Sequence, residues 1–216
     1  EMLSCMKPGS VLVDVAIEIL GQITSAVPRV LDLGTGSGAI ALAIKHTAPA
    51  TDVSAVDISA DALDTARRNG ERLGLPVHWL LGDWWQALEP LNGEDASVRR
   101  FDLIVSNPPY IAEHDPHLPA LHHEPTRALV SGHDGLDALR VLIARAGNWL
   151  HDGAWLLLEH GHDQAAAVAA LFDTPLECGG RWTGITHRRD LPVHVRCIGA
   201  RWQAGYMPGE GGKEWS

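Results

Sequence analysis

A ten-residue stretch, 101–110, places a side-chain amide and two prolines directly after an apolar run. Phe101 to Ser106 has the pattern of a buried strand, and it leads into Asn107-Pro108-Pro109-Tyr110. Proline fixes φ and lacks an N–H, so the carbonyls of this turn have set directions. The Asn107 side-chain oxygen and the Pro108 carbonyl could accept both hydrogens of a planar –NH2 group. Methylation of an amide or exocyclic amine needs such an arrangement, and the turn alone leaves adenine, guanine and glutamine open as acceptors.

A second candidate site is the glycine-rich segment 34–38, which follows an apolar run over 29–33. Gly34, Gly36 and Gly38 have no Cβ, so their backbone N–H groups can approach a ligand at the positive end of a helix. The spacing also fits a dinucleotide fingerprint, with Asp57 at about the distance of a ribose-binding carboxylate. The segment therefore predicts a nucleotide-type pocket, with a tight turn that binds no ligand as the alternative.

Asp83 and Trp84 follow a third apolar run, Val77 to Leu81. A carboxylate at a strand end suits an adenine amine, and an indole ring suits the face of a base. The Asn-Pro-Pro-Tyr turn has no role in hydride transfer, whereas it has a clear one in presenting an amine. The combination therefore favours a methyl-donor cofactor over a dinucleotide.

Apolar periodicity predicts that strands alternate with helices. Helices are expected over about 10–26, from 39 to about 46, after the capping residue Ser59, over a segment carrying Leu139, Leu142, Ile143, Ala146 and Leu150, and near 163–172. Strands are expected at 29–33, 53–56, 77–81, 101–106 and 154–159, with two weaker ones at about 176–182 and 193–199. Surface loops are expected over 86–100 and 108–133. This order predicts an α/β fold, a mostly parallel sheet with helices on both faces.

Composition narrows the function classes. The chain has 216 residues and a formal net charge of −10, which disfavours nucleic acid as a direct partner. It contains no apolar run long enough to span a bilayer and no signal pattern, so we expect no membrane association. Cys5, Cys178 and Cys197 lack metal-ligand spacing, and the twelve histidines, including His160 and His162, show no such pattern either. We therefore expect reduced thiols and no metal.

The combined motifs resemble a known family. Asp32-Leu33-Gly34-Thr35-Gly36-Ser37-Gly38, with acidic strand ends at Asp57 and Asp83, is similar to class I S-adenosylmethionine-dependent methyltransferases. The turn at 107–110 narrows the resemblance to enzymes that methylate planar amino groups. Three further segments resemble the bacterial release factor glutamine methyltransferases, the HemK/PrmC family: Ile111 to Leu118 with His123-Glu124-Pro125, Ser131 to Leu136, and Leu156 to Gly161.

The resemblance implies a Rossmann-like class I methyltransferase fold with a seven-stranded sheet. It implies S-adenosylmethionine as cofactor, class 1 peptide chain release factors as protein substrates and a cytoplasmic location. Asn107, Pro108, Pro109 and Tyr110 would hold the substrate glutamine, with Asn107, Pro108 and Tyr110 acting in catalysis. Cofactor binding would fall to Gly34, Thr35, Gly36, Ser37, Gly38, Asp57, Ile58, Asp83, Trp84 and Asn107.

The resemblance also predicts the domain organisation. Residues 1–28 are expected to be a residual N-terminal segment with one helix, in place of the family's helical substrate-binding domain. A methyltransferase domain is expected over 29–204 and a flexible tail over 205–216. Lys7 to Val11 replaces the acidic element that the family carries before its first helix. Two other functions stay open: methylation of a ribosomal protein glutamine or a nucleic acid, and a cofactor-binding module without turnover.

Overall fold

A computed structural model describes residues 11–89, 100–114, 130–176, 178–190 and 194–205. Its helices are α1 (Val11–Leu20), α2 (Ala39–Thr47), α3 (Ala60–Leu73), α4 (Asp137–Ala146) and α5 (Ala165–Leu171), with 3-10 helices η1 (Trp84–Leu88) and η5 (Gly147–Trp149). Its strands are β1 (Arg29–Leu33), β2 (Asp52–Asp57), β3 (His78–Leu81), β4 (Phe101–Ser106), β5 (Leu150–Glu159), β6 (Arg181–Asp190) and β7 (His194–Gln203).

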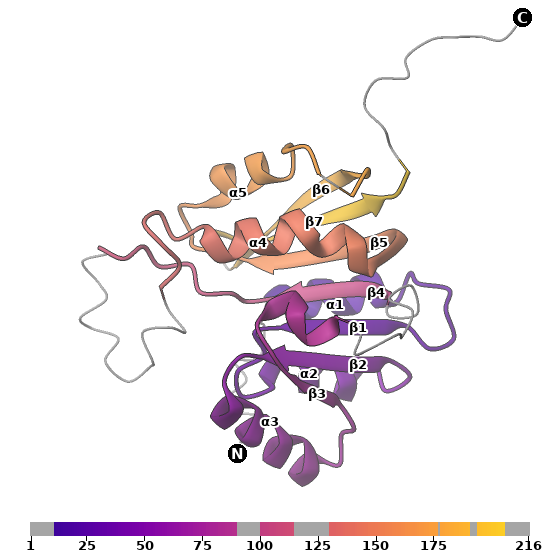
Figure 1. Ribbon diagram of the computed structural model, residues 1–216. Helices are drawn as coiled ribbons and strands as arrows, with labels where there is room; N and C mark the ends of the chain where they lie inside the picture. Colours follow the sequence, from indigo (N-terminus) through magenta and orange to yellow (C-terminus); the bar gives the residue numbers. More distant parts are fainter. Residues whose placement is uncertain (1–10, 90–99, 115–129, 177, 191–193, 206–216) are drawn as a thin grey trace, which may run out of the picture.

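The strands form one seven-stranded sheet in the order β3-β2-β1-β4-β5-β7-β6, which crosses the middle of the molecule in Figure 1. Strands β1 to β5 run parallel, while β7 is antiparallel to both β5 and β6. The strand order reverses between β1 and β4, which is the position where an open α/β sheet binds ligands at the carboxyl ends of its strands. This confirms the predicted α/β fold and its mostly parallel sheet.

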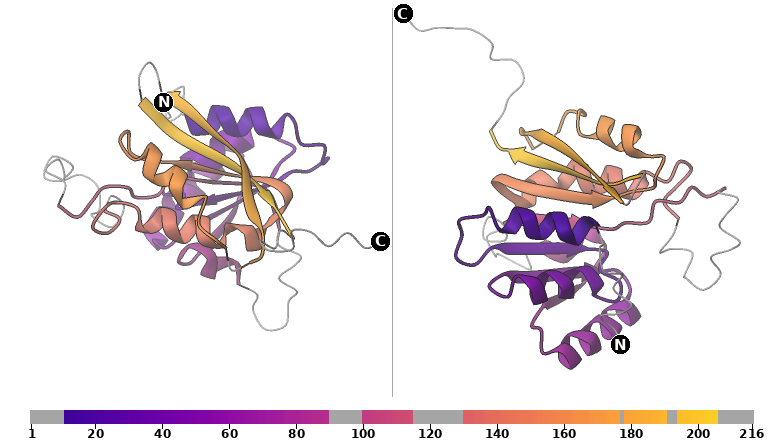
Figure 2. Two further views of the ribbon diagram at one scale, coloured as in Figure 1. Left: turned by 90° about the horizontal axis from the view of Figure 1, so that it is seen from above. Right: turned by 180° about the vertical axis from the view of Figure 1, so that it is seen from behind.

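Helices cover both faces of the sheet, as predicted (Figures 1 and 2). On one face, α1 and α2 pack on the sheet through a cluster that includes Leu12, Val15, Ala16, Ile19, Ala41 and Ile44. On the other face, α4, α5 and η1 pack through a larger cluster that includes Trp85, Leu88, Leu139, Leu142, Ile143 and Val168. Because apolar residues recur at helical spacing on α1 and α4, each helix buries one stripe. Helix α1 thus belongs to the same core as the sheet.

Three predicted segments were misplaced. The first helix ends at Leu20 rather than near 26, because the chain turns at Gly21. Leu150 is not helical; it pairs with Phe101 and begins β5. The strand expected at 176–182 is β6, displaced to 181–190, and β7 extends to Gln203. The β6–β7 hairpin is rich in threonine, histidine and arginine, so it lacks the alternation that marks a half-buried strand.

The loop expected over 86–100 is also partly wrong. Its first residues belong to η1, in which Trp85 and Leu88 are buried. The Trp85 indole N–H donates to the Val141 carbonyl at 3.1 Å, and its ring stacks on Trp149 at a centroid distance of 6.4 Å. Two large buried side chains, three residues apart, thus pack η1 onto the core.

Several predictions lie outside the described residues. They concern Cys5, Lys7 to Ser10, the loop motifs at 115–118 and 123–125, and the tail beyond Gly205. Of the cysteines that the structure describes, Cys178 and Cys197 are both free. Within the described ranges, no helix has both the length and the apolar character needed to cross a bilayer. The division into 1–28, 29–204 and 205–216 stays a prediction.

Candidate active site

The glycine loop, residues 34–38, joins β1 to α2 at the point where the strand order reverses. Gly36 has a φ of 56° and Gly38 a φ of 82°, in the left-handed region that favours glycine. A Cβ on Gly38 would lie 2.9 Å from the Trp79 ring, whereas one on Gly36 would meet nothing within 4 Å. Gly38 therefore serves packing, while Gly36 leaves open space beside the backbone.

Asp57, the last residue of β2, holds the glycine loop in place. Its Oδ2 accepts from the Gly36 amide at 2.8 Å, and its Oδ1 accepts from the Ser59 amide, also at 2.8 Å. Ser59 in turn caps α3, because its hydroxyl accepts from the Ala62 amide at 3.2 Å. Each carboxylate oxygen has a second lone pair, so the half-buried Asp57 can accept further hydrogen bonds.

Asp32 is a buried carboxylate directly beneath the glycine loop. Its Oδ2 accepts from the Thr35 hydroxyl at 2.6 Å and from the Ala41 amide at 3.2 Å. Its Oδ1 is buried and has no hydrogen-bond partner. Burial raises the pKa of Asp32 from 3.8 to about 6. A buried acceptor with no partner is costly, so this oxygen marks a place suited to a cation or a donor.

Apolar and acidic side chains flank the glycine loop at the ends of β2 and β3. Ile58 is 62% exposed and Leu81 is 58% exposed, and Leu81 pairs in the sheet with Asp57. Asp83 is exposed, and its side chain makes no cap bond to η1. Such an apolar surface could pack against the face of a purine base, and the Asp83 carboxylate could accept a hydrogen bond from the edge of the base.

Trp84 combines an unusual backbone with a position against the loop. It is the one non-glycine residue of the described ranges with a positive φ, 44°, a conformation that costs a bulky residue about 1–2 kcal/mol. A Cβ on Gly34 would lie 3.1 Å from the Trp84 ring, so the indole lies directly against the first glycine of the loop. Strain that persists beside a candidate ligand site is consistent with a functional position.

The Asn-Pro-Pro-Tyr turn, residues 107–110, begins beside the glycine loop. The Ser106 hydroxyl donates to the Leu33 carbonyl at 2.6 Å, and both residues are buried and paired across β4 and β1. This bond joins the start of the turn to the start of the loop. Asn107 is exposed, Pro108 is buried, and Pro109 and Tyr110 are half-buried. The exposed Asn107 thus directly follows the residue that is bonded to the last residue before the glycine loop.

Comparisons with known proteins agree with this geometry. Residues 11–132 match the family model described as the methyltransferase small domain. The release factor glutamine methyltransferase of Xylella fastidiosa (strain 9a5c) is 56% identical over 149 residues, covering 68% of this chain and 51% of that protein. The corresponding protein of Burkholderia pseudomallei (strain K96243) is 43% identical over 198 residues, covering 88% of this chain and 65% of that protein.

A solved structure extends the comparison to almost the whole chain. The release factor-specific protein-(glutamine-N5) methyltransferase of Alicyclobacillus acidocaldarius is 32% identical, with a TM-score of 0.54, and the match covers 93% of this chain and 96% of that one. The chain belongs to the release factor glutamine methyltransferases. This confirms the predicted family and the S-adenosylmethionine cofactor of that class. The chain spans about half the length of the first curated relatives that it matches.

The described residues fit the cofactor of the family. The space at Gly36 and the amides of the glycine loop suit the methionine part of S-adenosylmethionine, and the unpartnered Oδ1 of Asp32 suits its ammonium group. Asp57 can accept from ribose hydroxyls, and the Ile58 surface with Asp83 suits an adenine ring. The structure brings every residue predicted for the site to the carboxyl ends of β1 to β4 or just beyond them. The individual roles of these residues stay predictions.

Sequence reasoning missed Asp32, Ser106 and Leu81 as site residues. Asp32 had a usable signal, because it is the one charged residue within the apolar run Val30 to Leu33. Ser106 had a weaker one, a hydroxyl at the end of a strand that is otherwise buried. Leu81 had none, because exposure of an apolar residue follows only from the position of β3 at the sheet edge.

The histidines do not gather into a metal site within the described residues, where no group of three potential ligands occurs. His114 and His133 form an edge-to-face pair at 6.2 Å. His160 is buried, its Nδ1 lies 2.7 Å from the Gly161 carbonyl, and burial lowers its pKa. The residues His117, His122, His123 and Glu124 lie outside the described ranges.

Asp32→Asn is expected to stabilise the ligand-free chain at neutral pH and to weaken cofactor binding. The folded-state pKa of Asp32, about 6, exceeds the ordinary 3.8, so the folded chain binds this proton more tightly than the unfolded chain does. Stability is therefore lost as the pH rises from about 4 to about 6, and the loss is complete above this window. At ~1.4 kcal/mol per pKa unit the loss is about 3 kcal/mol.

Urea unfolding at a series of pH values measures this effect. The free energy of unfolding of Asp32→Asn should exceed that of the wild type above pH 6 by up to about 3 kcal/mol, with the difference vanishing near pH 4. Calorimetry should show weaker binding of S-adenosylmethionine. Asp173→Asn, a change at an exposed position after α5, is the control and should alter neither quantity. A less stable Asp32→Asn variant with intact binding would contradict the interpretation.

Proposed function

We propose that this chain transfers a methyl group from S-adenosylmethionine to the side-chain nitrogen of the glutamine in the Gly-Gly-Gln motif of class 1 peptide chain release factors. The observation that carries the proposal is the exposed Asn107, joined to the glycine loop through the bond between Ser106 and Leu33. An acceptor site and a donor site thus share one edge of the sheet. The names of the relatives support release factors as the substrate.

On the cofactor side, the chain's own groups bind and orient. The glycine loop, residues 34–38, would hold the methionine part together with Asp32, and Asp57 would accept from the ribose. Ile58 and Trp84 would form the walls of the nucleoside pocket, and Asp83 would accept from the adenine amine. The strained φ of Trp84 and its contact with Gly34 support this role. When bound, S-adenosylmethionine supplies an activated methyl group.

On the acceptor side, the Asn-Pro-Pro-Tyr turn would hold the glutamine amide. The Asn107 side-chain oxygen and the Pro108 carbonyl accept its two N–H hydrogens, while Tyr110 forms a wall of the slot. Holding donor and acceptor in a near-attack geometry can supply about 7–11 kcal/mol of barrier reduction. Two acceptors on the –NH2 hydrogens also stabilise the positive charge that develops on nitrogen. The N-methylated amidium is acidic, so no strong base is needed to remove its proton.

The proposal extends to the partner and the compartment. A release factor is the protein partner, the location is the cytoplasm, and nucleic acid is not a direct partner. The formal net charge of −10 supports the last point, since binding through phosphates favours a basic surface.

Transfer of labelled methyl groups tests the function. The chain is incubated with methyl-labelled S-adenosylmethionine and, separately, a class 1 release factor, the same factor with the motif glutamine changed to asparagine, a ribosomal protein fraction, and DNA. We expect label on the unmodified factor alone, mapped to the glutamine side chain. Label on DNA or the ribosomal fraction alone would overturn the proposal in favour of those substrates. Cofactor binding without any label would identify a binding module without turnover.

A further inference from the structure

The far end of the Asn-Pro-Pro-Tyr turn is held by Gln164, which lies outside the turn, the glycine loop and the segments that carry the family resemblance. We propose that Gln164 is a positioning residue that sets the place of Tyr110 and, through it, the slot for the acceptor amide. This inference deepens the proposed function and rests on it.

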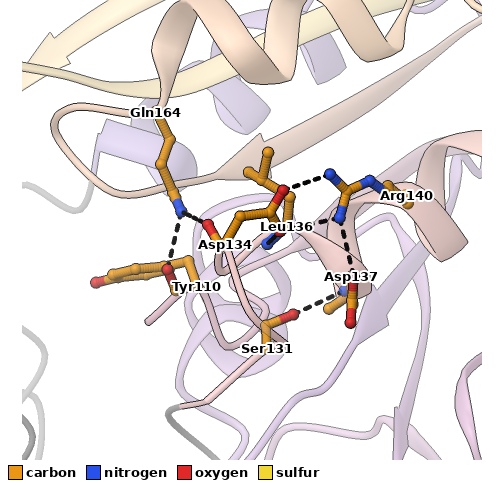
Figure 3. A network of polar contacts seen from close by, with 8 residues as sticks. Tyr110, Ser131, Asp134, Leu136, Asp137, Arg140 and Gln164 are labelled. Atoms are coloured by element: carbon orange, nitrogen blue, oxygen red, sulfur yellow. Dashed lines mark hydrogen bonds and ion pairs between the residues drawn. The ribbon is translucent and has the colours of Figure 1, made fainter. Parts of the chain in front are cut away.

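The side chain of Gln164 bridges three segments of the chain, and Figure 3 shows two of its contacts, with Tyr110 and Asp134. Its Nε2 donates to the Tyr110 carbonyl at 2.9 Å and to the Asp134 carbonyl at 3.4 Å. Its Oε1 accepts from the Gly161 amide at 2.9 Å. One half-buried amide group thus joins the end of the turn, the loop before α4 and the chain after β5.

The backbone of Gln164 is fixed independently of this side chain. Gln164 is the N-cap residue of α5, where its amide donates to the Gly161 carbonyl at 3.1 Å and its carbonyl accepts from the Val168 amide at 2.9 Å. Val168 is buried in the core that α5 shares with the sheet. The side-chain amide therefore extends from a rigid element toward the turn.

The contact at Tyr110 is close enough to require a glycine. Gly135 has a φ of 76°, and a Cβ there would lie 2.3 Å from the Tyr110 carbonyl oxygen and 2.8 Å from the Gln164 Nε2. Any side chain at 135 would therefore displace this hydrogen bond. The absence of a side chain at Gly135 therefore leaves the room in which Gln164 reaches the Tyr110 carbonyl.

The loop before α4 has its own supports, so it offers a firm surface. Arg140 forms ion pairs with Asp134 and Asp137, the second at 2.8 Å. The hydrogen bond from Arg140 lowers the pKa of Asp134 to about 2, so this pair persists into acidic solution. The Ser131 hydroxyl accepts from the Ala138 amide at 2.8 Å, which attaches the loop to the first turn of α4 (Figure 3).

The turn is consequently held at both ends. Ser106 fixes its start against the glycine loop, and Gln164 fixes its end at Tyr110. Pro108 and Pro109 lie between these points, and their locked φ angles leave little freedom to absorb a displacement. A shift of Tyr110 therefore reaches the Pro108 carbonyl and the Asn107 amide, the two groups that would hold the acceptor.

Two substitutions distinguish two roles of the Gln164 side chain: positioning of the turn through Tyr110, and simple anchoring of the segment before α5 through Gly161. Gln164→Glu keeps an acceptor for the Gly161 amide but places a carboxylate against the carbonyls of Tyr110 and Asp134. Gln164→Met keeps the length of the side chain and removes both the hydrogen-bond donor and the acceptor. Gln203→Glu is the matched control, an exposed position on β7 whose Oε1 accepts from Arg181 Nε at 2.7 Å.

The order of turnover numbers decides between the two roles. If Gln164 positions the turn, kcat on the release factor falls in the order wild type, Gln164→Met, Gln164→Glu, with Gln164→Glu about 100-fold below wild type, as expected for a displacement of ~1 Å. The Kd for S-adenosylmethionine, measured by calorimetry, stays within about twofold, because the glycine loop is untouched. Gln203→Glu keeps wild-type values. If Gln164→Glu kept wild-type turnover while Gln164→Met lost it, Gln164 would only anchor Gly161, and the inference would be overturned. A loss of cofactor affinity that parallels the loss of turnover in these variants would overturn it as well.

Hydrogen exchange keeps this inference separable from the proposed function. The Glu113 amide, just beyond the turn, donates to the Gly132 carbonyl at 3.0 Å, so its exchange reports whether the segment after Tyr110 stays in place. If the wild type methylates no glutamine, the proposed function fails, while exchange at Glu113 still tests the contact. We expect exchange at least about tenfold faster in Gln164→Glu than in wild type or Gln203→Glu. Equal rates in all three proteins would overturn the inference.

Discussion

Asn107→Ala is expected to lower turnover on the release factor by at least about 100-fold while leaving the affinity for S-adenosylmethionine largely unchanged. The substitution removes one of the two acceptors that would hold the glutamine –NH2 group. Removal of a single group that is positioned for the developing charge typically costs about 10²–10³ in kcat. Asn107 is exposed, and its neighbour Ser106 still ties β4 to Leu33, so the fold and the glycine loop should persist.

Single-turnover transfer of labelled methyl groups measures the chemical step, and calorimetry measures cofactor binding. Asn148→Ala is the matched control, since Asn148 is an exposed asparagine on η5, remote from the carboxyl ends of β1 and β4. It should retain wild-type rates. Near wild-type methylation by Asn107→Ala would show that the mechanism proposed for the turn is wrong.

Gly36→Val is expected to abolish binding of S-adenosylmethionine, with at least about a 100-fold loss of affinity, or ~2.8 kcal/mol. The φ of Gly36, 56°, is strained for any β-branched residue. A valine side chain would also project into the open space beside the loop, where nothing lies within 4 Å. In the proposed site the methionine part of the cofactor would occupy this space, so we expect the substitution to act mainly on binding.

Gly184→Val separates backbone strain from steric exclusion. Gly184 has a φ of 59°, and a Cβ there also meets nothing within 4 Å, but it lies on β6 at the far edge of the sheet. Both variants should lose a similar ~1–2 kcal/mol of stability from the left-handed backbone. Only Gly36→Val should lose the cofactor in calorimetry. Equal binding by the two variants would show that the space beside Gly36 is not the cofactor site.

Most of the fold was predictable because local patterns and global packing agree. The runs at 29–33 and 101–106 are mostly apolar, as expected for strands buried on both faces, and both appear within the predicted bounds. Ser59 was recognised as the cap of α3 because a hydroxyl precedes a helical pattern. The failures lie where this agreement is missing: β6 is mostly polar, and η1, with Trp85 and Leu88 buried, opens a stretch predicted to be a loop.

The candidate site divides in a similar way. Motifs at 34–38 and 107–110 carry their chemistry in residue type and local spacing, so the sequence by itself determined the family, the cofactor class and the turn that would hold an amide. It could also predict that Asp57 and Asp83 lie at the same end of the sheet, since the carboxyl ends of parallel strands meet there.

Only the tertiary structure decided how those parts are held. The bond from Ser106 to the Leu33 carbonyl joins residues 73 positions apart, and the bond from Gln164 to Tyr110 spans 54 positions. Burial also leaves the Oδ1 of Asp32 without a hydrogen-bond partner. The residues next to Asp32 in the sequence do not predict this missing partner. Such contacts depend on which elements the sheet order brings together, because hydrogen bonds between distant segments follow from packing rather than from local pattern. The residues proposed to perform the chemistry could therefore be named from the sequence, whereas the residues that hold them in place could be found only from the fold.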